Sequence, residues 1–398
     1  MKIDGISLKI IPDSRGDDTL EATLKSGDFT ASASVPSGKS TGKNEVAVVS
    51  AKQALDKISW LTAQLKDHDF VTLDQFDQLL ITLDGTENKS NLGGNLILAL
   101  SMAFCRLLSK AGNLELYQLL AKISGTKSFS MPFCFYNLIE GGVHTPPGDL
   151  PFQEYLFVPQ TQSPRESLNH TLIFIKALEE KIKERFGQVN FGDEGGYVVP
   201  SNDPMVGLQI LQEVTEETGF SDSKLSLDVA ASSFVEDGKY RVGDKLLDKE
   251  QLLEAYKQIV NNYPVLSIED PFSEEDWQGF TEIAKKLGDR VWIVGDDLTT
   301  TNVKRIKQAE SKKAANAVII KPNQIGSVSE AIQAARLAKS YGWKIIVSHR
   351  SGETLDTFIA DLAVGLGADG LKSGCPLQKE RLVKYERLVE IESRIKTK

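Results

Sequence analysis

The sequence predicts an α/β protein in which a small N-terminal α+β domain is followed by a larger α/β barrel. Three observations predict this fold class. Residues 6–35 alternate apolar and polar side chains, which is typical of strands, and residues 46–123 repeat apolar positions three and four apart, which is typical of helices. From about residue 130, short apolar runs alternate with helical segments. We place the two domains at residues 1–125 and 130–398.

The first strands are expected to form an antiparallel meander, because turn residues separate three short alternating runs. The apolar positions are Ile6, Leu8 and Ile10 in the first run, Leu20, Ala22 and Leu24 in the second, and Phe29, Ala31 and Ala33 in the third. Helices follow the strands, and this order is typical of an α+β domain. The longest apolar stretch, residues 96–108, is too short to span a bilayer and is interpreted as a buried helix.

The second part of the chain repeats a unit of one short apolar strand, a polar residue and a helical segment. Successive strand ends lie about 25 residues apart, which is the length that a strand, a crossover helix and two loops occupy. One longer interval contains VEDGKYRV, whose Asp-Gly turn predicts an extra hairpin. This rhythm indicates a parallel barrel, and such barrels carry their active sites at the C-terminal ends of the strands.

Six successive predicted strands end in residues that can do chemistry, and these are Asp228, Glu269, Asp296, Lys321, His349 and Lys372. A polar residue often ends a strand only because the chain must turn, so one position alone says little. The three carboxylates would repel one another in one pocket unless a cation joined them. Oxygen-only ligands suit Mg²⁺. We therefore predict a magnesium site at the three carboxylates, with structural salt bridges as the alternative.

Lys321 and Lys372 lie on the strands that follow the carboxylates. A lysine beside a metal and another lysine can act as a general base, although it can also merely balance the carboxylates. Arg350 and Ser351 follow the next strand and offer a guanidinium and a hydroxyl to an anion. VPSGKSTG superficially resembles a phosphate loop, but it lacks the required GxxxxGK[ST] spacing, and we reject that interpretation.

Composition narrows the function classes further. The chain has 398 residues, 41% of them hydrophobic, and a net charge of −9, which is typical of a soluble globular protein. The negative charge argues against a nucleic-acid partner or an anionic membrane surface. Cys105, Cys134 and Cys375 are widely spaced, so we expect free thiols in a reducing compartment. With no signal-peptide pattern and no predicted membrane span, we expect a cytoplasmic protein.

A series of ordered motifs resembles the enolase family over nearly the whole chain. The motifs are DSRG at 13–16, PSGKSTG at 36–42, LDGTENKSNLGGN at 83–95, GGVH at 141–144, FQE at 152–154, GDEGG at 192–196, LDVAASSF at 227–234, SIEDPF at 267–272, GDDLT at 295–299, IKPNQIGS at 320–327, SHRSGET at 348–354 and LKSG at 371–374. The resemblance implies a small N-terminal domain that caps a modified TIM barrel. It also implies the family's reaction in glycolysis and gluconeogenesis, the reversible dehydration of 2-phosphoglycerate to phosphoenolpyruvate with two Mg²⁺ ions.

The resemblance implies roles for individual residues. Lys321 matches the base that removes the C2 proton, and Glu194 matches the acid that assists loss of the C3 hydroxyl. Asp228, Glu269 and Asp296 match the ligands of the first Mg²⁺. The other matched positions are Glu154 beside Glu194, Lys372 near the substrate carboxylate, the active-site histidines His144 and His349, the phosphate contacts Arg350 and Ser351, the substrate-binding residue Gln153, and Ser40 as ligand of the second Mg²⁺. The family also implies a homodimer or an assembly of dimers.

The sequence departs from the family pattern at a few positions. Glu140 stands where Asn is expected, and Lys39 precedes Ser40 where a small residue is usual. TPPGDLP, after His144, carries two prolines that can stiffen a loop expected to close over substrate. The family's final tail does not follow the helical segment ERLVEIESRI. None of these departures removes a chemical group, but they bear on loop closure and catalytic efficiency.

Two alternatives to an enolase remain open at this point. One is another acid-sugar dehydratase of the same superfamily, against which the SHRSGET and GDEGG motifs argue. The other is a non-catalytic binding or scaffold protein on the same fold, which the loss of a catalytic residue would support. The sequence retains all the matched residues.

Overall fold

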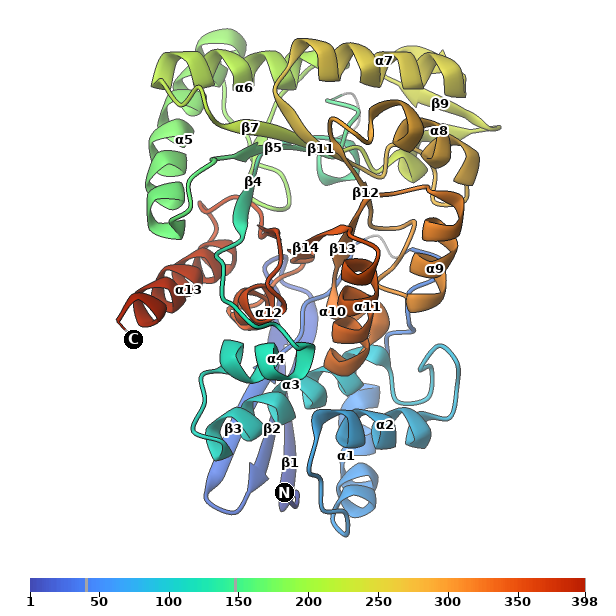
Figure 1. Cartoon of the computed structure of the whole chain (residues 1–398), viewed down its shortest axis with the longest axis vertical. Coiled ribbons are helices and arrows are strands. Elements are labelled where there is room, and N and C mark those ends of the chain that lie inside the picture. The colour runs from blue at the N-terminus through green and yellow to red at the C-terminus, as the bar shows by residue number, and fades with distance from the viewer. Residues whose placement is uncertain (40–41, 147–148, 398) are drawn as a thin grey trace.

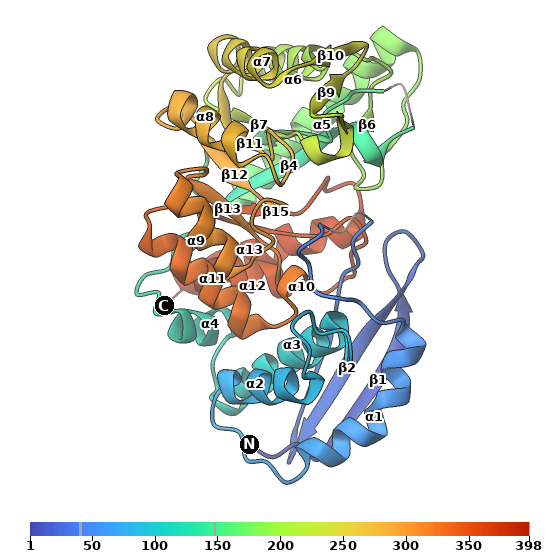
Figure 2. The same ribbon diagram turned by 90° about the vertical axis from the view of Figure 1, so that its right-hand side faces the viewer.

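The computed structural model describes residues 1–39, 42–146 and 149–397. Figures 1 and 2 show two lobes stacked along the long axis, with the N-terminal strands and helices below and the barrel with its surrounding helices above. The predicted α/β fold, a small α+β domain followed by a barrel, is confirmed.

The N-terminal lobe contains a three-stranded sheet and four helices. These elements are β1 (Gly5–Pro12), β2 (Asp18–Ser26), β3 (Phe29–Ser34), α1 (Ala51–Leu65), α2 (Leu73–Asp84), α3 (Gly94–Ala111) and α4 (Leu116–Ser124). The sheet is antiparallel in the order β1–β2–β3, as the alternation predicts. Reciprocal hydrogen bonds cap the first two helices, between Ser50 and Gln53 in α1 and between Thr72 and Gln75 in α2.

Helix α3 forms the centre of the N-terminal core. It packs on β2 and β3, and Leu96, Leu100 and Phe104 are fully buried there. Among the helices of the described ranges, α3 alone is long and apolar enough to cross a membrane, but 72% of it is buried inside the protein. That burial is typical of a core helix, as the sequence predicts.

Eight strands close the barrel. They are β4 (Phe133–Glu140), β5 (Glu154–Val158), β7 (Lys224–Asp228), β11 (Val265–Glu269), β12 (Trp292–Gly295), β13 (Ala317–Ile320), β14 (Lys344–Ser348) and β15 (Gly370–Lys372), and β15 pairs with β4. Strand β5 runs antiparallel to both β4 and β7, whereas the remaining barrel pairs are parallel. The described part of the β4–β5 connection contains no crossover α-helix, so the chain returns directly and β5 is reversed.

Helices surround the barrel, and short elements decorate its rim. The helices are α5 (Pro164–Phe186), α6 (Met205–Thr218), α7 (Lys249–Asn262), α8 (Trp277–Leu287), α9 (Val303–Lys312), α10 (Pro322–Ile325), α11 (Val328–Ser340), α12 (Phe358–Leu366) and α13 (Lys379–Lys396), with single 3₁₀ turns η1 (Gly142–His144) and η2 (Ala231–Phe234). The small strands are β6 (Tyr197–Val198), β8 (Val235–Glu236), β9 (Lys239–Val242) and β10 (Lys245–Leu247). The predicted hairpin is β8–β9, whose Asp237 and Gly238 both have positive φ, as an Asp-Gly turn requires.

The inward side chains of the barrel form a separate apolar cluster beneath the mouth. Its buried members are Phe135, Leu156, Val158, Val294, Ala317, Ile319 and Ile346. Because side chains alternate along a strand, the next inward position after Ala317 and Ile319 is Lys321. The same alternation places Asp296 after Val294. The apolar cluster therefore supports the polar residues that follow it on the same face of each strand.

Partly buried ion pairs join the two lobes. Arg106 of α3 donates two hydrogen bonds, of 2.6 and 2.7 Å, to the carboxylate of Asp356 before α12. Lys89, before α3, pairs with Glu330 of α11 at 3.0 Å. These contacts hold the N-terminal domain against the barrel.

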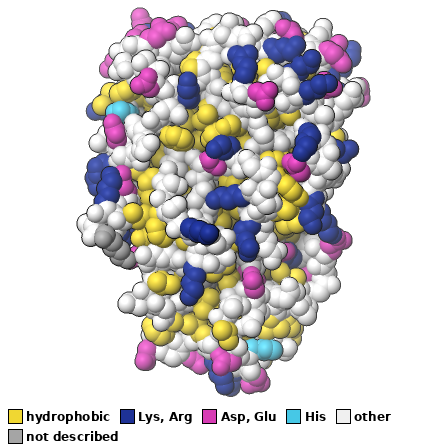
Figure 3. All heavy atoms as spheres, viewed as in Figure 1, with side chains coloured by type: hydrophobic (Ala, Val, Ile, Leu, Met, Phe, Trp, Pro, Cys, Tyr) yellow, Lys and Arg dark blue, Asp and Glu magenta, His cyan; other side chains and the backbone are white. Residues whose placement is uncertain are grey.

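Neither the thiols nor the visible surface indicates a further class of function. Cys105, Cys134 and Cys375 are free, as predicted, and all three are buried; burial raises the pKa of the Cys375 thiol to about 12. On the face that Figure 3 shows, basic side chains are interspersed with acidic and apolar ones. Burial therefore keeps Cys375 in its protonated thiol form, although it lies three residues after Lys372.

Candidate active site

A cavity of about 260 Å³ opens at the mouth of the barrel, where the parallel strands end. The predicted site residues that line it are His144, Gln153, Glu154, Glu194, Asp228, Asp296, Lys321, His349, Arg350, Ser351 and Lys372. Glu269 lies beneath them, in contact with Lys372. Ser40, the predicted ligand of a second Mg²⁺, lies outside the described residues.

Strand register brings three of the carboxylates side by side. Glu154 pairs with Asp228 across β5 and β7, and Asp228 pairs with Glu269 across β7 and β11. Because β5 is reversed, its first residue lies at the same end of the barrel as the last residues of β7 and β11. The reversed strand therefore adds a fourth carboxylate to the three that the sequence places at strand ends.

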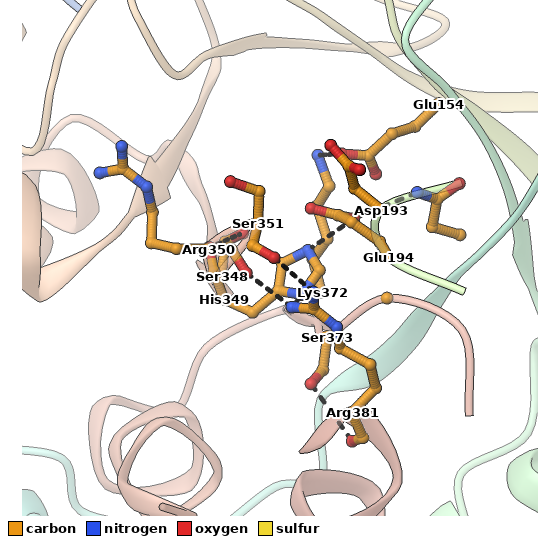
Figure 4. A network of polar contacts seen from close by, with 12 residues as sticks. Glu154, Asp193, Glu194, Ser348, His349, Arg350, Ser351, Lys372, Ser373 and Arg381 are labelled. Atoms are coloured by element: carbon orange, nitrogen blue, oxygen red, sulfur yellow. Dashed lines mark hydrogen bonds and ion pairs between the residues drawn. The ribbon is translucent and has the colours of Figure 1, made fainter. Parts of the chain in front are cut away.

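Lys372 lies at the centre of these carboxylates, as Figure 4 shows for Glu154. Its Nζ atom is 2.7 Å from Asp228, 3.0 Å from Glu269 and 3.2 Å from Glu154. Burial by itself would lower the pKa of Lys372, but the three negative charges outweigh it and raise the pKa well above its ordinary value. Lys372 is thus a fixed cation at the floor of the cavity.

Lys321 makes a second buried ion pair with Asp296. Nζ of Lys321 contacts one carboxylate oxygen of Asp296, and Gln324 donates a 2.8 Å hydrogen bond to the other. Burial opposes the charge on Lys321, but Asp296 outweighs it and raises the lysine pKa, while Arg350 and Lys372 act in the opposite direction. Lys321 is therefore protonated in this arrangement.

The acidic residues offer a donor set that suits a divalent cation. One oxygen of Glu269, Oε1, is buried without a hydrogen-bond partner among the described residues. Burial, and next the charge of Asp228, raise the pKa of Glu269 well above its ordinary value. A buried carboxylate oxygen in this situation is stabilised by a cation. The predicted residues therefore fit Mg²⁺ chemically.

The structure also brings Asp296 together with two carboxylates that the sequence prediction did not include. Single oxygens of Asp270, Asp296 and Asp297 lie within 4.8 Å of one another, whereas Lys372 stands between Asp228 and Glu269. Asp270 accepts backbone N–H bonds from Asp296 and Asp297, at 3.0 and 2.7 Å. Asp270 thus fixes the backbone that carries Asp296.

His144, Glu154 and Glu194 form a second buried cluster, in which one possible metal-ligand atom of each lies within 4.8 Å of the others, and Glu154 joins it to the carboxylates around Lys372. Burial raises the pKa of Glu154 well above its ordinary value, and Lys372 only partly offsets this effect. Burial would also raise the pKa of Glu194, but the contact with the His349 ring and the charges of His144 and Arg381 outweigh it and hold that pKa well below its ordinary value. The two neighbouring carboxyl groups therefore differ, one favouring its protonated form and the other its ionised form.

The predicted anion site combines residues of both domains. Arg350 donates to Glu45 of the N-terminal domain, at 2.8 and 3.2 Å, and to Asn323 at 3.1 Å. The hydroxyl of Ser351 accepts 2.9 Å hydrogen bonds from the Arg15 guanidinium and from the backbone N–H of Lys39. The β1–β2 connection and the segment before α1 therefore hold Arg350 and Ser351 at the cavity that both residues line.

Arg381, which the sequence analysis did not single out, supports the same loop from behind. Figure 4 shows its guanidinium pointing toward the chain at His349. It donates hydrogen bonds of 2.6 Å to the carbonyl of Arg350 and 2.7 Å to that of Ser351, and it lies 2.9 Å from Nδ1 of His349. No local motif marks Arg381, because it lies in an ordinary charged helix, α13. Arg15 lies in the DSRG motif, which is the signal that could have found it.

Comparisons with known proteins identify the family. The family model described as "Enolase, C-terminal TIM barrel domain" matches residues 128–398, and "Enolase, N-terminal domain" matches residues 3–120. Curated proteins named enolase from Thermococcus gammatolerans and Pyrococcus furiosus are each 41% identical over 413 residues, which covers 99% of this chain and 95% of each relative. The enolase of Methanocaldococcus jannaschii is 40% identical over 410 residues, covering 99% of this chain and 96% of the relative. The chain therefore belongs to the enolase family.

Proposed function

We propose that this protein is a lyase that reversibly dehydrates 2-phosphoglycerate to phosphoenolpyruvate in glycolysis and gluconeogenesis. The observation that carries the proposal is one cavity lined both by Lys321, paired with Asp296, and by two carboxyl groups of opposite proton affinity, Glu154 and Glu194. The full-length identity to proteins named enolase supports the same reaction.

Lys321 is the base in this proposal, and Lys372 binds the substrate carboxylate. The C2 proton passes to Nζ of Lys321, and the electron pair left behind is shared with the substrate carboxylate. A lysine accepts a proton only when it is neutral, and Asp296 holds Lys321 as a cation in this structure. We therefore expect Lys321 and Asp296 to separate in the reactive complex.

Glu194 and Glu154 assist the departure of the C3 hydroxyl. The C3–O bond breaks as the C2 electron pair forms the double bond, and the hydroxyl leaves as water after it takes a proton from the carboxyl pair. The raised pKa of Glu154 suits it to hold that proton, and ionised Glu194 lies beside it. His144, Gln153 and the His349 loop complete the wall on this side.

The phosphate of the substrate is proposed to bind at Arg350 and Ser351, because a guanidinium and a hydroxyl suit a phosphate group. Glu45 occupies the Arg350 guanidinium in this structure, so the phosphate must share or replace that contact. Asp228, Glu269 and Asp296 would hold the first Mg²⁺, and Ser40 a second. When bound, Mg²⁺ offsets the charge of the carboxylates and stabilises negative charge that develops on the substrate.

One spectrophotometric assay tests the proposal. Phosphoenolpyruvate formation from 2-phosphoglycerate is measured with Mg²⁺, after EDTA, and after Mg²⁺ is restored, with Lys321→Ala as the inactive control. We expect activity that EDTA abolishes and Mg²⁺ recovers. Full turnover in metal-free buffer would contradict the magnesium site. The absence of turnover with Mg²⁺ would favour another acid-sugar substrate or a binding role.

Three further properties belong to the same proposal. We propose a cytoplasmic protein that forms a homodimer or an assembly of dimers, in keeping with its family. We also propose domains of residues 1–125 and 130–398, a division that the separate family matches at 3–120 and 128–398 support. Sedimentation velocity of the purified protein tests the oligomeric state.

A further inference from the structure

Glu140, at the end of β4, is a buried carboxylate that does not line the cavity. It accepts backbone N–H bonds from Gly196 at 2.6 Å and from Glu194 at 3.1 and 3.2 Å. Its side chain is fully buried. The carboxylate therefore binds the middle and the C-terminal end of the 192–196 turn, which carries Glu194.

The glycines of this turn fit closely around the Glu140 carboxylate. A Cβ atom at Gly192 would lie 2.5 Å from Oε2 of Glu140, and one at Gly196 would lie 2.9 Å from Oε1. The turn is also closed on itself by a 2.9 Å hydrogen bond from the N–H of Gly192 to the carbonyl of Gly196. Only glycine at these two positions lets the backbone reach the carboxylate so closely.

The same carboxylate also faces His144. Oε2 of Glu140 lies 3.4 Å from Nδ1 of His144, which is buried in the 3₁₀ turn after β4. Three acidic groups act on this imidazole: Glu140 from β4, Glu194 from the 192–196 turn and Glu154 from β5. Burial would lower the pKa of His144, but these charges outweigh it, Glu140 first, and raise the pKa to about 9.

We propose that Glu140 is a positioning residue that joins two separate segments of the active site, the turn bearing Glu194 and the 3₁₀ turn bearing His144. The inference deepens the proposed function, on which its catalytic consequence rests. A carboxylate suits this position because both of its oxygens accept. Oε1 accepts from the N–H groups of Gly196 and Glu194, while Oε2 shares the Glu194 N–H and also faces a protonated Nδ1 of His144.

Glutamine cannot replace both functions. In Glu140→Gln, the carbonyl oxygen of the new side chain can still accept the N–H groups of Glu194 and Gly196, but its amide nitrogen then faces His144 as a donor. This variant therefore separates the two contacts, because it retains the turn and reverses the contact to His144. Glu140→Ala removes both. The matched control is Asp361→Asn, another buried carboxylate, which binds Arg387 and the backbone of Tyr117 outside the cavity.

Two readouts without substrate test the positioning role. The first is hydrogen exchange of the 192–196 peptide, measured by mass spectrometry. We expect Glu140→Ala to exchange at least about ten times faster than the parent protein, whereas Glu140→Gln and Asp361→Asn stay within about twofold. The second is the ¹H–¹³C ring spectrum, in which four histidines give few signals. The His144 signal should move in both Glu140 variants and stay in place in Asp361→Asn.

Turnover gives the catalytic readout. We expect kcat to fall about tenfold in Glu140→Gln and at least about a hundredfold in Glu140→Ala, with the control unchanged. Unaltered exchange and an unaltered His144 signal in both Glu140 variants would overturn the inference, whether or not the protein turns over 2-phosphoglycerate. If Glu140→Ala fails to fold, the His144 signal of Glu140→Gln still tests the inference. A shifted signal supports it, and an unmoved signal overturns it. A protein with the expected exchange and ring shifts but no turnover in any form would refute the proposed function alone.

Discussion

The guanidinium of Arg381 lies 2.9 Å from Nδ1 of His349, and this contact determines which ring nitrogen carries the proton. A guanidinium only donates, so Nδ1 accepts and the ring proton sits on Nε2. Nε2 in turn lies 3.1 Å from a carboxylate oxygen of Glu194. Burial lowers the pKa of His349 to about 3, with Arg381 reinforcing it against the opposing charge of Glu194. A neutral His349 thus faces an ionised Glu194.

Replacing Arg381 should disturb both the ring and the loop. In Arg381→Met the carbonyls of Arg350 and Ser351 lose their donor, and we expect the free energy of unfolding to fall by about 2–4 kcal/mol. The positive charge that lowers the pKa values of His349 and Glu194 is also lost, so both should rise. Denaturant unfolding and ring ¹⁵N shifts of His349 measure these effects. A variant with parent stability and an unmoved His349 signal would contradict the assignment.

The fold was predictable because its determinants are local. Alternation along the N-terminal strands and the regular interval between barrel strands are visible in the sequence, and the structure confirms both. The reversal of β5 was not visible from periodicity, because residues 154–158 alternate in the same way whichever direction the strand runs. Its direction depends on the path of the β4–β5 connection, which is a tertiary feature.

Site residues that end a strand could be predicted from the sequence. Contacts that depend on side-chain reach or on distant segments could not. Strand order alone places Asp228, Glu269 and Lys372 at the barrel mouth. It could not predict that Lys372 lies between the two carboxylates, because that contact depends on side-chain reach. Arg381 and Glu45 were missed for another reason: they reach the site only when a C-terminal helix and an N-terminal loop pack on the barrel.

Asp77, on α2, should make stability depend on pH. Burial raises its pKa from 3.8 to about 7, although Ser101 and Ser329 donate hydrogen bonds to it. The folded protein therefore favours the protonated form. The stabilising contribution is fully present below about pH 4 and is lost as the pH rises toward 7.

Asp77→Asn mimics the protonated carboxyl group, so it should raise the free energy of unfolding at pH 8 by about 1–3 kcal/mol, with little effect near pH 4. Urea unfolding at the two pH values measures the difference. Asp361→Asn is the comparison, since it breaks an ion pair with Arg387 and should destabilise the protein at pH 8. Equal effects of Asp77→Asn at both pH values would refute the linkage.

Lys39 should contribute little to catalysis despite its place at the cavity rim. Its ammonium group is 2.6 Å from Asp193 and 3.0 Å from the carbonyl of Val143, but 46% of the side chain is exposed. Exposed ion pairs of this kind contribute about 0–1 kcal/mol. We expect Lys39→Ala and Asp193→Asn each to change kcat/KM by less than about tenfold, with a smaller effect at high salt. A larger loss in Lys39→Ala alone would mean that the lysine contacts the substrate phosphate.

The last prediction separates the base from the acid. Glu194→Gln keeps the shape of the side chain but weakens the carboxyl pair that protonates the leaving hydroxyl, and it leaves Lys321 and the carboxylates around Lys372 in place. This variant should form little phosphoenolpyruvate yet still exchange the C2 hydrogen of 2-phosphoglycerate with D₂O. Lys321→Ala should lose both activities, because the C2 proton is never removed.

The size and pattern of these losses distinguish the roles. A general acid or base typically contributes about 10²–10⁴-fold, so both variants should lose at least that much net turnover. NMR of substrate recovered from D₂O with Mg²⁺ measures the exchange. Glu154→Gln is the informative companion: because burial makes Glu154 the carboxyl group that favours its proton, this variant should resemble Glu194→Gln and retain exchange. If Lys321→Ala exchanges the C2 hydrogen while Glu194→Gln does not, the assigned roles are reversed, since exchange requires only the base.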